Sequence, residues 1–189
     1  MKSRAVFLDR DGVLNETVYV DGIDCPPADA HSLVLIPTAA EAVQRLRRAG
    51  FLCICVTNQP DIARGTRSVE NVMAMNLKVS TELELDDLFM CPHDTLDGCS
   101  CRKPKPGMLI AAAKKWGLEL ANCWMVGDRK TDIAAGYAVG CRTVFVRNPP
   151  TGDAINPTPD FVCTDVGEAS RHILTAAGMT NGKVNDHHR

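Results

Sequence analysis

Short apolar runs alternate along this chain with longer segments of helical periodicity, and this alternation restricts the fold more than any other feature. Buried parallel strands are continuous apolar runs, whereas helices carry apolar residues three or four positions apart. The expected strands are 5–8, 51–56, 88–91, 123–126 and 143–146. The expected helices are 38–50, 68–85, 107–117 and 131–140. We therefore predict an α/β fold with a doubly wound, mainly parallel sheet, whose ligands bind beyond the carboxyl ends of the strands.

The helix expected over 68–85 has an uncertain buried face, because Met73 and Met75 lie on different sides of it. One helical stripe combines most of its apolar residues, and we expect this stripe to face the core. Its members are Val69, Val72, Met73, Asn76, Leu77, Ser80 and Leu83.

Size and charge limit the classes of function. A chain of 189 residues that is 45% hydrophobic can bury one substantial core, so we expect one domain over 1–177 and a flexible tail over 178–189. A net charge of -2 disfavours nucleic acid as a partner. The chain shows no apolar run of membrane-spanning length and no signal-peptide core. We predict a cytoplasmic monomer that contacts no membrane.

Nine cysteines without an export signal indicate buried thiols or metal ligands rather than disulfides. Most of those within or beside apolar runs are expected to act as small core residues. These are Cys53, Cys55, Cys123, Cys141 and Cys163. Cys25 could belong to either class. The loop that contains it, 21–32, is the longest irregular stretch and is expected to border the functional site.

The remaining cysteines cluster with a histidine in "CPHDTLDGCSC". Cys91-x-His93 and Cys99-x-Cys101 are separated by a short connection, and a Cys₃His set is a recognised structural zinc site. Unligated thiols or a redox pair are the alternatives. We predict that Zn²⁺ orders a loop over 91–101 and thereby positions the basic residues that follow it, Arg102 and Lys103.

Polar residues follow the expected strands at the edge where a ligand would bind. Asp9 and Asp11 follow the first strand and could point to one side, with Arg10 pointing away. Thr57 and Asn58 follow the second. Asp128 and Asp132 stand at a helix start, and "RKPKPG" supplies lysines. Together they suit a magnesium-assisted phosphoryl transfer to or from a small phosphorylated metabolite.

Four segments, "FLDRDG", "VTNQ", "RKPKPG" and "VGDRKTD", resemble the motifs of the haloacid dehalogenase (HAD) superfamily of phosphatases. The resemblance implies a Rossmann-like core, a nucleophile at Asp9 that forms an aspartyl phosphate, and a general acid and base at Asp11. It also implies that Thr57 and Lys103 hold the phosphoryl group, with Lys105 as the alternative to Lys103.

The same resemblance assigns the metal and substrate contacts. It places Mg²⁺ on the Asp9 side chain, the Asp11 carbonyl and Asp128, with Asp132 in support. Candidate substrate-binding residues at these strand ends are Asn58, Gln59, Arg102 and Arg129. No long insertion follows the first two motifs, so we expect no separate cap domain.

A zinc loop before "RKP" resembles one HAD branch, which includes phosphatases of D-glycero-D-manno-heptose 1,7-bisphosphate and of histidinol phosphate. "IARG" (62–65) favours removal of the heptose 7-phosphate, whereas the short zinc loop is nearer the histidinol-phosphate type. Pro60, Asp61 and Arg129 depart from the heptose pattern and adjoin the expected site. A protein that binds sugar phosphate without turnover is a third alternative.

Overall fold

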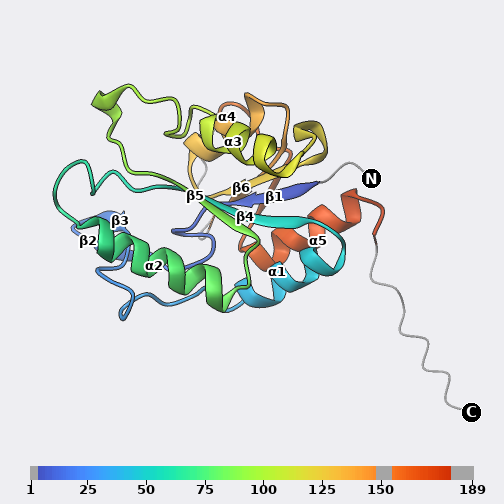
Figure 1. Ribbon diagram of the computed structural model, residues 1–189. Coiled ribbons are helices and arrows are strands. Elements are labelled where there is room, and N and C mark those ends of the chain that lie inside the picture. Colours follow the sequence, from blue (N-terminus) through green and yellow to red (C-terminus); the bar gives the residue numbers. More distant parts are fainter. Residues whose placement is uncertain (1–3, 148–154, 180–189) are drawn as a thin grey trace, which may run out of the picture.

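Six strands form one parallel sheet in the order β5-β4-β1-β6-β7-β8 in the computed structural model, which describes residues 4–147 and 155–179 (Figure 1). All five neighbouring pairs run parallel. The strands are β1 Ala5–Leu8, β4 Leu52–Asn58, β5 Asp87–Cys91, β6 Trp124–Gly127, β7 Arg142–Val146 and β8 Phe161–Cys163. The predicted α/β class with a parallel sheet is confirmed. The sequence analysis did not predict β8, which has only three residues.

Helices cover both faces of the sheet (Figure 1). The helices are α1 Ala39–Arg48, α2 Val69–Glu82, α3 Gly107–Trp116, α4 Lys130–Tyr137 and α5 Val166–Ala176, with short 3₁₀ helices η1 Thr95–Asp97 and η2 Leu120–Asn122. Because successive strand residues point to opposite faces, Val6 and Leu8 join the core beneath α1, α2 and α5. Ala5 and Phe7 join the second core, against α3. This alternation builds two hydrophobic layers from one strand.

The stripe predicted to bury α2 is wrong in part. The buried residues of α2 are Val72, Met75, Asn76 and Val79, and Leu83 follows them into the core. Val69, Met73 and Leu77 are instead 43%, 60% and 68% exposed. Asn76 must face inward because its Oδ1 accepts a hydrogen bond from the buried Arg10, and this contact is invisible to local periodicity.

A small antiparallel hairpin lies between β1 and α1, formed by β2 Val18–Val20 and β3 Ile23–Cys25. Asp21 and Gly22 connect the strands with positive φ angles of 48° and 85°, as a two-residue hairpin turn requires. The prediction of an irregular loop over 21–32 is therefore wrong at its start, where half-buried Cys25 belongs to β3. Within the described residues no separate cap domain is present.

The five cysteines expected in the core are all buried. None of the helices in the described part of the chain combines the length and the apolar character that crossing a membrane would need. Most of the tail predicted for 178–189 lies outside the described residues, which end at 179.

Candidate active site at the carboxyl ends of the strands

Three carboxylates converge where β1 and β6 end. Asp9 follows β1, Asp128 follows β6, and Asp132 lies in the first turn of α4. One carboxylate oxygen from each lies within 4.8 Å of those of the other two. Two glycines permit this approach. A Cβ on Gly12 would lie 2.3 Å from Asp128 Oδ2, and one on Gly127 would lie 2.1 Å from Asp132 Cβ. The predicted acidic strand ends therefore form one cluster.

Lys103 is the cation of this cluster and is only 2% exposed. Its Nζ lies 2.8 Å from Asp9 Oδ1 and 2.7 Å from Asp132 Oδ1, and it donates to the Val56 carbonyl at 2.6 Å. Burial opposes the charge, but Asp132 and Asp9 outweigh burial and raise the pKa of Lys103. Lys105 points elsewhere and donates to the carbonyls of the zinc loop, so the geometry places Lys103 beside Asp9.

The acidic cluster carries more negative charge than Lys103 neutralises. Burial raises the pKa of Asp9 to about 6, even though the Lys103 ammonium acts in the opposite direction. Burial and the charges of Asp9 and Asp132 raise the pKa of Asp128 to about 8. Asp128 Oδ1 is buried and has no hydrogen-bond partner among the described residues. Oxygen ligands arranged in this way fit a hard divalent cation such as Mg²⁺.

Arg10 does not point away from the site, contrary to the sequence-based prediction. It is fully buried, and its Nη2 contacts both carboxylate oxygens of Asp11, at 3.1 and 3.0 Å. Its Nη1 donates to Asn76 of α2 at 2.7 Å. The prediction assumed extended alternation, but β1 ends at Leu8 and the chain turns immediately afterwards. No local signal in "DRDG" reveals the contact between Arg10 and Asn76.

Further donors fix Asp11. Asn15 Nδ2 donates to its Oδ1 at 3.0 Å, and Gln59 Nε2 donates to its Oδ2 at 2.8 Å. Gln59 also donates to Thr57 Oγ1 at 2.9 Å, so both side chains belong to the network around the site. Of these, sequence reasoning missed Asn15, whose side chain is buried beneath the turn after β1.

Asn58 joins the end of β4 to the segment after the zinc loop. Its Nδ2 donates to the Lys103 carbonyl at 3.0 Å, and its Oδ1 accepts from the Lys103 amide at 3.0 Å. Its two polar side-chain atoms therefore hold the backbone of the lysine that reaches Asp9.

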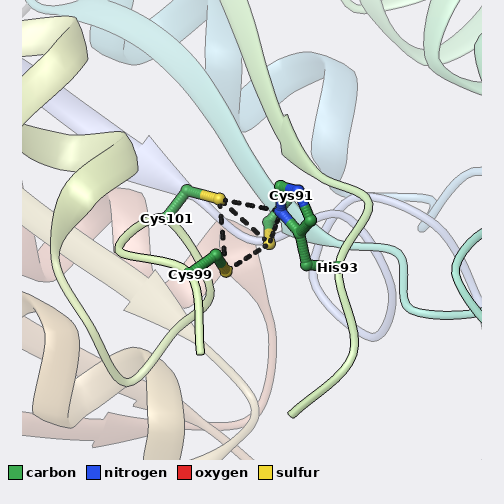
Figure 2. Close-up of side chains that lie close together, drawn as sticks. All are labelled: Cys91, His93, Cys99 and Cys101. Atoms are coloured by element: carbon green, nitrogen blue, oxygen red, sulfur yellow. Dashed lines mark hydrogen bonds between the residues drawn. The ribbon is translucent and has the colours of Figure 1, made fainter. Parts of the chain in front are cut away.

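The predicted zinc ligands gather at the end of β5 (Figure 2). Cys91 Sγ lies 3.7 Å from Cys99 Sγ and 3.2 Å from Cys101 Sγ, and His93 Nδ1 lies 3.6 Å from Cys91 Sγ. A tetrahedron with zinc–sulfur bonds of about 2.3 Å has edges of about 3.8 Å, so the four side chains fit one Zn²⁺. The cluster is consistent with a structural zinc site.

The two predicted arginines occupy different places. Arg102 donates from Nη1 to the His93 carbonyl at 3.1 Å, beside the zinc ligands. Arg129 is exposed and donates to the carbonyl of Asp24 in the hairpin at 3.3 Å. A cavity of about 760 Å³ lies next to Gly12 and Asp128, and its polar wall includes Glu16, Thr17 and Asp24.

Comparisons with known proteins agree with this geometry. A family model described as HAD-hydrolase-like matches residues 100–169. A Vibrio cholerae protein named D-glycero-beta-D-manno-heptose-1,7-bisphosphate 7-phosphatase is 36% identical over 187 residues, which cover 92% of this chain and 95% of that protein. A Pasteurella multocida protein of the same name is 38% identical over 157 residues, covering 76% and 82%.

Solved structures show the same fold. The crystal structure of D,D-heptose 1,7-bisphosphate phosphatase from B. bronchiseptica, complexed with magnesium and phosphate, superimposes with a TM-score of 0.77 at 30% identity. That match covers 92% of this chain and 99% of the other. A putative HAD-like phosphatase from Mesorhizobium loti gives a TM-score of 0.74 at 29% identity, covering 92% and 87%.

Proposed function

The chain belongs to the family of HAD-like phosphatases that includes the D-glycero-D-manno-heptose-1,7-bisphosphate 7-phosphatases, and we propose that it removes the 7-phosphate of such a bisphosphate through Asp9. One observation carries the assignment of roles. A buried lysine, Lys103, joins Asp9 to Asp132 and donates to the carbonyl of Val56, the residue before Thr57, so the nucleophile lies next to a group that would hold a phosphoryl group.

The contacts of Asp9 support its role as the nucleophile. Among the described residues, the hydrogen bonds to its carboxylate, from Lys103 Nζ and the Arg10 amide, both end on Oδ1. Oδ2 is therefore the oxygen available for attack on phosphorus. Lys103 and the Thr57 hydroxyl would stabilise the charge of the transferring group, because preorganised donors in a buried site cost no reorganisation during reaction.

Asp11 would carry the protons. In the first step Asp9 bonds to phosphorus, the ester P–O bond breaks, and the leaving sugar oxygen takes a proton from Asp11. In the second step water attacks phosphorus, gives a proton to Asp11, and the bond to Asp9 breaks, which releases phosphate. Arg10, Asn15 and Gln59 orient the Asp11 carboxylate for both steps.

Two metals fit the chain. When bound at Asp9, Asp128 and the Asp11 carbonyl, with Asp132 in support, Mg²⁺ would neutralise the carboxylates and the incoming phosphate. Asp128 Oδ1, buried without a partner among the described residues, supports this assignment. Zn²⁺ on Cys91, His93, Cys99 and Cys101 would order the loop that leads into Lys103.

The cavity beside Asp128 supports a polyhydroxylated substrate. Glu16, Thr17 and Asp24 offer acceptors and donors to sugar hydroxyls, and a volume of about 760 Å³ suits a small ligand. Histidinol phosphate is the second candidate, since the same acidic groups would accept a hydrogen bond from its ammonium group and the zinc loop is short. We further propose a monomer, and we place it in the cytoplasm because none of the nine cysteines forms a disulfide.

The first experiment compares phosphate release from D-glycero-D-manno-heptose 1,7-bisphosphate and from histidinol phosphate, as kcat/KM with Mg²⁺. We expect a preference for the heptose of at least about tenfold, which corresponds to about 1.4 kcal/mol in transition-state binding. Asp9→Asn should abolish release from both substrates. The matched control, Asp21→Asn, changes an exposed carboxylate in the hairpin turn and should leave the rate unchanged. Preference for histidinol phosphate would reassign the substrate, and turnover by Asp9→Asn would refute the mechanism.

A further inference from the structure

The segment 60–67, which links β4 to α2, lies against the zinc loop 91–101 and is joined to it at both backbone and side-chain level. The Gln59 amide donates to the Cys91 carbonyl at 2.7 Å, and the Ala63 amide donates to the Pro92 carbonyl at 3.2 Å. The two acceptors are Cys91, a predicted zinc ligand, and its neighbour Pro92. Segment 60–67 and the residue before it are therefore hydrogen-bonded to the zinc loop.

Arg64 and Asp94 add a bidentate ion pair to these backbone contacts. Arg64 Nε donates to Asp94 Oδ2 at 2.8 Å, and Nη2 donates to Oδ1 at 3.0 Å. Paired parallel hydrogen bonds of this kind hold the orientation of both side chains, unlike a single surface contact. Asp94 stands immediately after His93 and also caps η1 through its bond from the Thr95 amide.

Segment 60–67 carries this connection onward, toward the catalytic side. Its first neighbour, Gln59, contacts Asp11 and Thr57. At its other end Arg67 donates to the carbonyl of Pro27, in the stretch after the hairpin. Asp61 departs from the heptose pattern. Its Oδ1 lies 3.7 Å from Arg64 Nη1, and its Oδ2 lies 3.9 Å from Arg67 Nε. Two arginines of the same segment therefore lie close to its negative charge.

We propose that Arg64 and Asp94 are positioning residues that join segment 60–67 to the zinc loop, so that zinc orders both at the substrate side of the site. The proposal rests on the proposed zinc site and phosphatase function, but its main readout does not need turnover. Lys103 is held separately, by Asp9, Asp132 and Asn58. The ion pair should therefore affect substrate binding more than the chemical step.

Trypsin provides the test, because segment 60–67 contains two cleavable bonds, after Arg64 and after Arg67, and the bond after Arg67 remains when Arg64 is replaced. The variants are Arg64→Gln, Asp94→Asn and the double variant, each loaded with Zn²⁺ and checked for zinc content. Asn at 94 retains an oxygen that can cap η1. Arg47→Gln is the matched control, because Arg47 pairs with Glu84 and Asp86 on the surface, outside this contact.

We expect chelation of zinc to speed cleavage after Arg67 by at least about tenfold. Each single variant should speed it several-fold in the zinc-loaded protein, and the double variant should be no faster than the single ones, since the residues act as a pair. Arg47→Gln should match the wild type. Equal cleavage rates for wild type and both single variants would overturn the proposal. A double variant whose rate increase equals the combined increases of the two single variants would also overturn it.

Steady-state kinetics of the two single variants distinguish a positioning role from a purely structural one. Both variants should raise KM for the phosphate ester several-fold and change kcat less than about twofold. A fall in kcat without a change in KM would overturn the proposed role at the substrate side. If the chain hydrolysed none of the tested esters, the proposed function would fail, whereas the proteolysis result would still decide whether zinc and segment 60–67 are coupled.

Discussion

Replacing Lys103 by methionine isolates the contribution of one buried charge. Methionine preserves most of the side-chain volume but removes the ammonium group that lies 2.8 Å from Asp9 and 2.7 Å from Asp132. The variant would therefore retain Asp9, Asp128 and Asp132 within 4.8 Å of one another without this counter-charge. Both stability and catalysis should suffer, for different reasons.

The structure sets the scale of the stability loss. At an effective dielectric constant of about 20, each of the two contacts has a gross Coulomb energy of about 6 kcal/mol. Desolvation of the buried ions cancels much of this, and removal of one partner from a buried pair typically costs about 3–5 kcal/mol. For a chain of this size that loss corresponds to a fall in Tm of roughly 6–20 °C. Loss of the cation should also lower kcat by about 10²- to 10³-fold.

Urea unfolding at pH 8 and pH 5 provides the assay. Lys105→Met is the matched control because, among the described residues, the Lys105 ammonium donates only to zinc-loop carbonyls. Without Lys103 the carboxyls bind protons more readily in the folded state, so the deficit of Lys103→Met should shrink at pH 5. Lys105→Met should stay within about 1 kcal/mol of the wild type. If Lys103→Met were as stable as Lys105→Met at pH 8, the argument from the buried charge would be refuted.

Three further predictions test other parts of the site. Cys99→Ser should reduce bound zinc from about one ion per chain and make the remainder easier to chelate, as metal analysis would show; full zinc retention would contradict the Cys₃His site. The raised pKa values of Asp9 and Asp128, about 6 and about 8 against the ordinary value of 3.8, mean that the folded metal-free protein binds extra protons. Its free energy of unfolding should therefore fall as pH rises from about 4 to 8. The affinity for Mg²⁺ should increase between pH 6 and 8, because the ligands lose their protons there. Urea titrations with and without Mg²⁺ would measure both trends. Arg10→Met leaves Asp11 without its cation and should destabilise the fold by about 3–5 kcal/mol in chemical unfolding; an unchanged midpoint would show that the pair contributes no net stability.

Much of the sheet and the zinc site could be predicted because both depend on local patterns. Buried strands such as 5–8 are runs of apolar residues, and a zinc loop keeps its four ligands within 91–101. A helix over 68–85 was also expected and is present, but its buried face was only partly predicted. The inward turn of Asn76 depends on Arg10, which lies 66 positions away in the chain, and a local window contains no trace of such a contact.

The sequence by itself determined which chemical groups the chain places after each strand, because carboxylates, a hydroxyl and lysines occupy positions that parallel strands bring to one edge. Only the tertiary structure showed which of Lys103 and Lys105 reaches Asp9, since two lysines two positions apart are equivalent in a motif. It also decided that Arg10 is buried against Asn76 of α2, 66 positions away, and that Arg64 meets Asp94 across 30 positions of chain. Long-range contacts of this kind follow from packing of the whole chain, which no local pattern encodes.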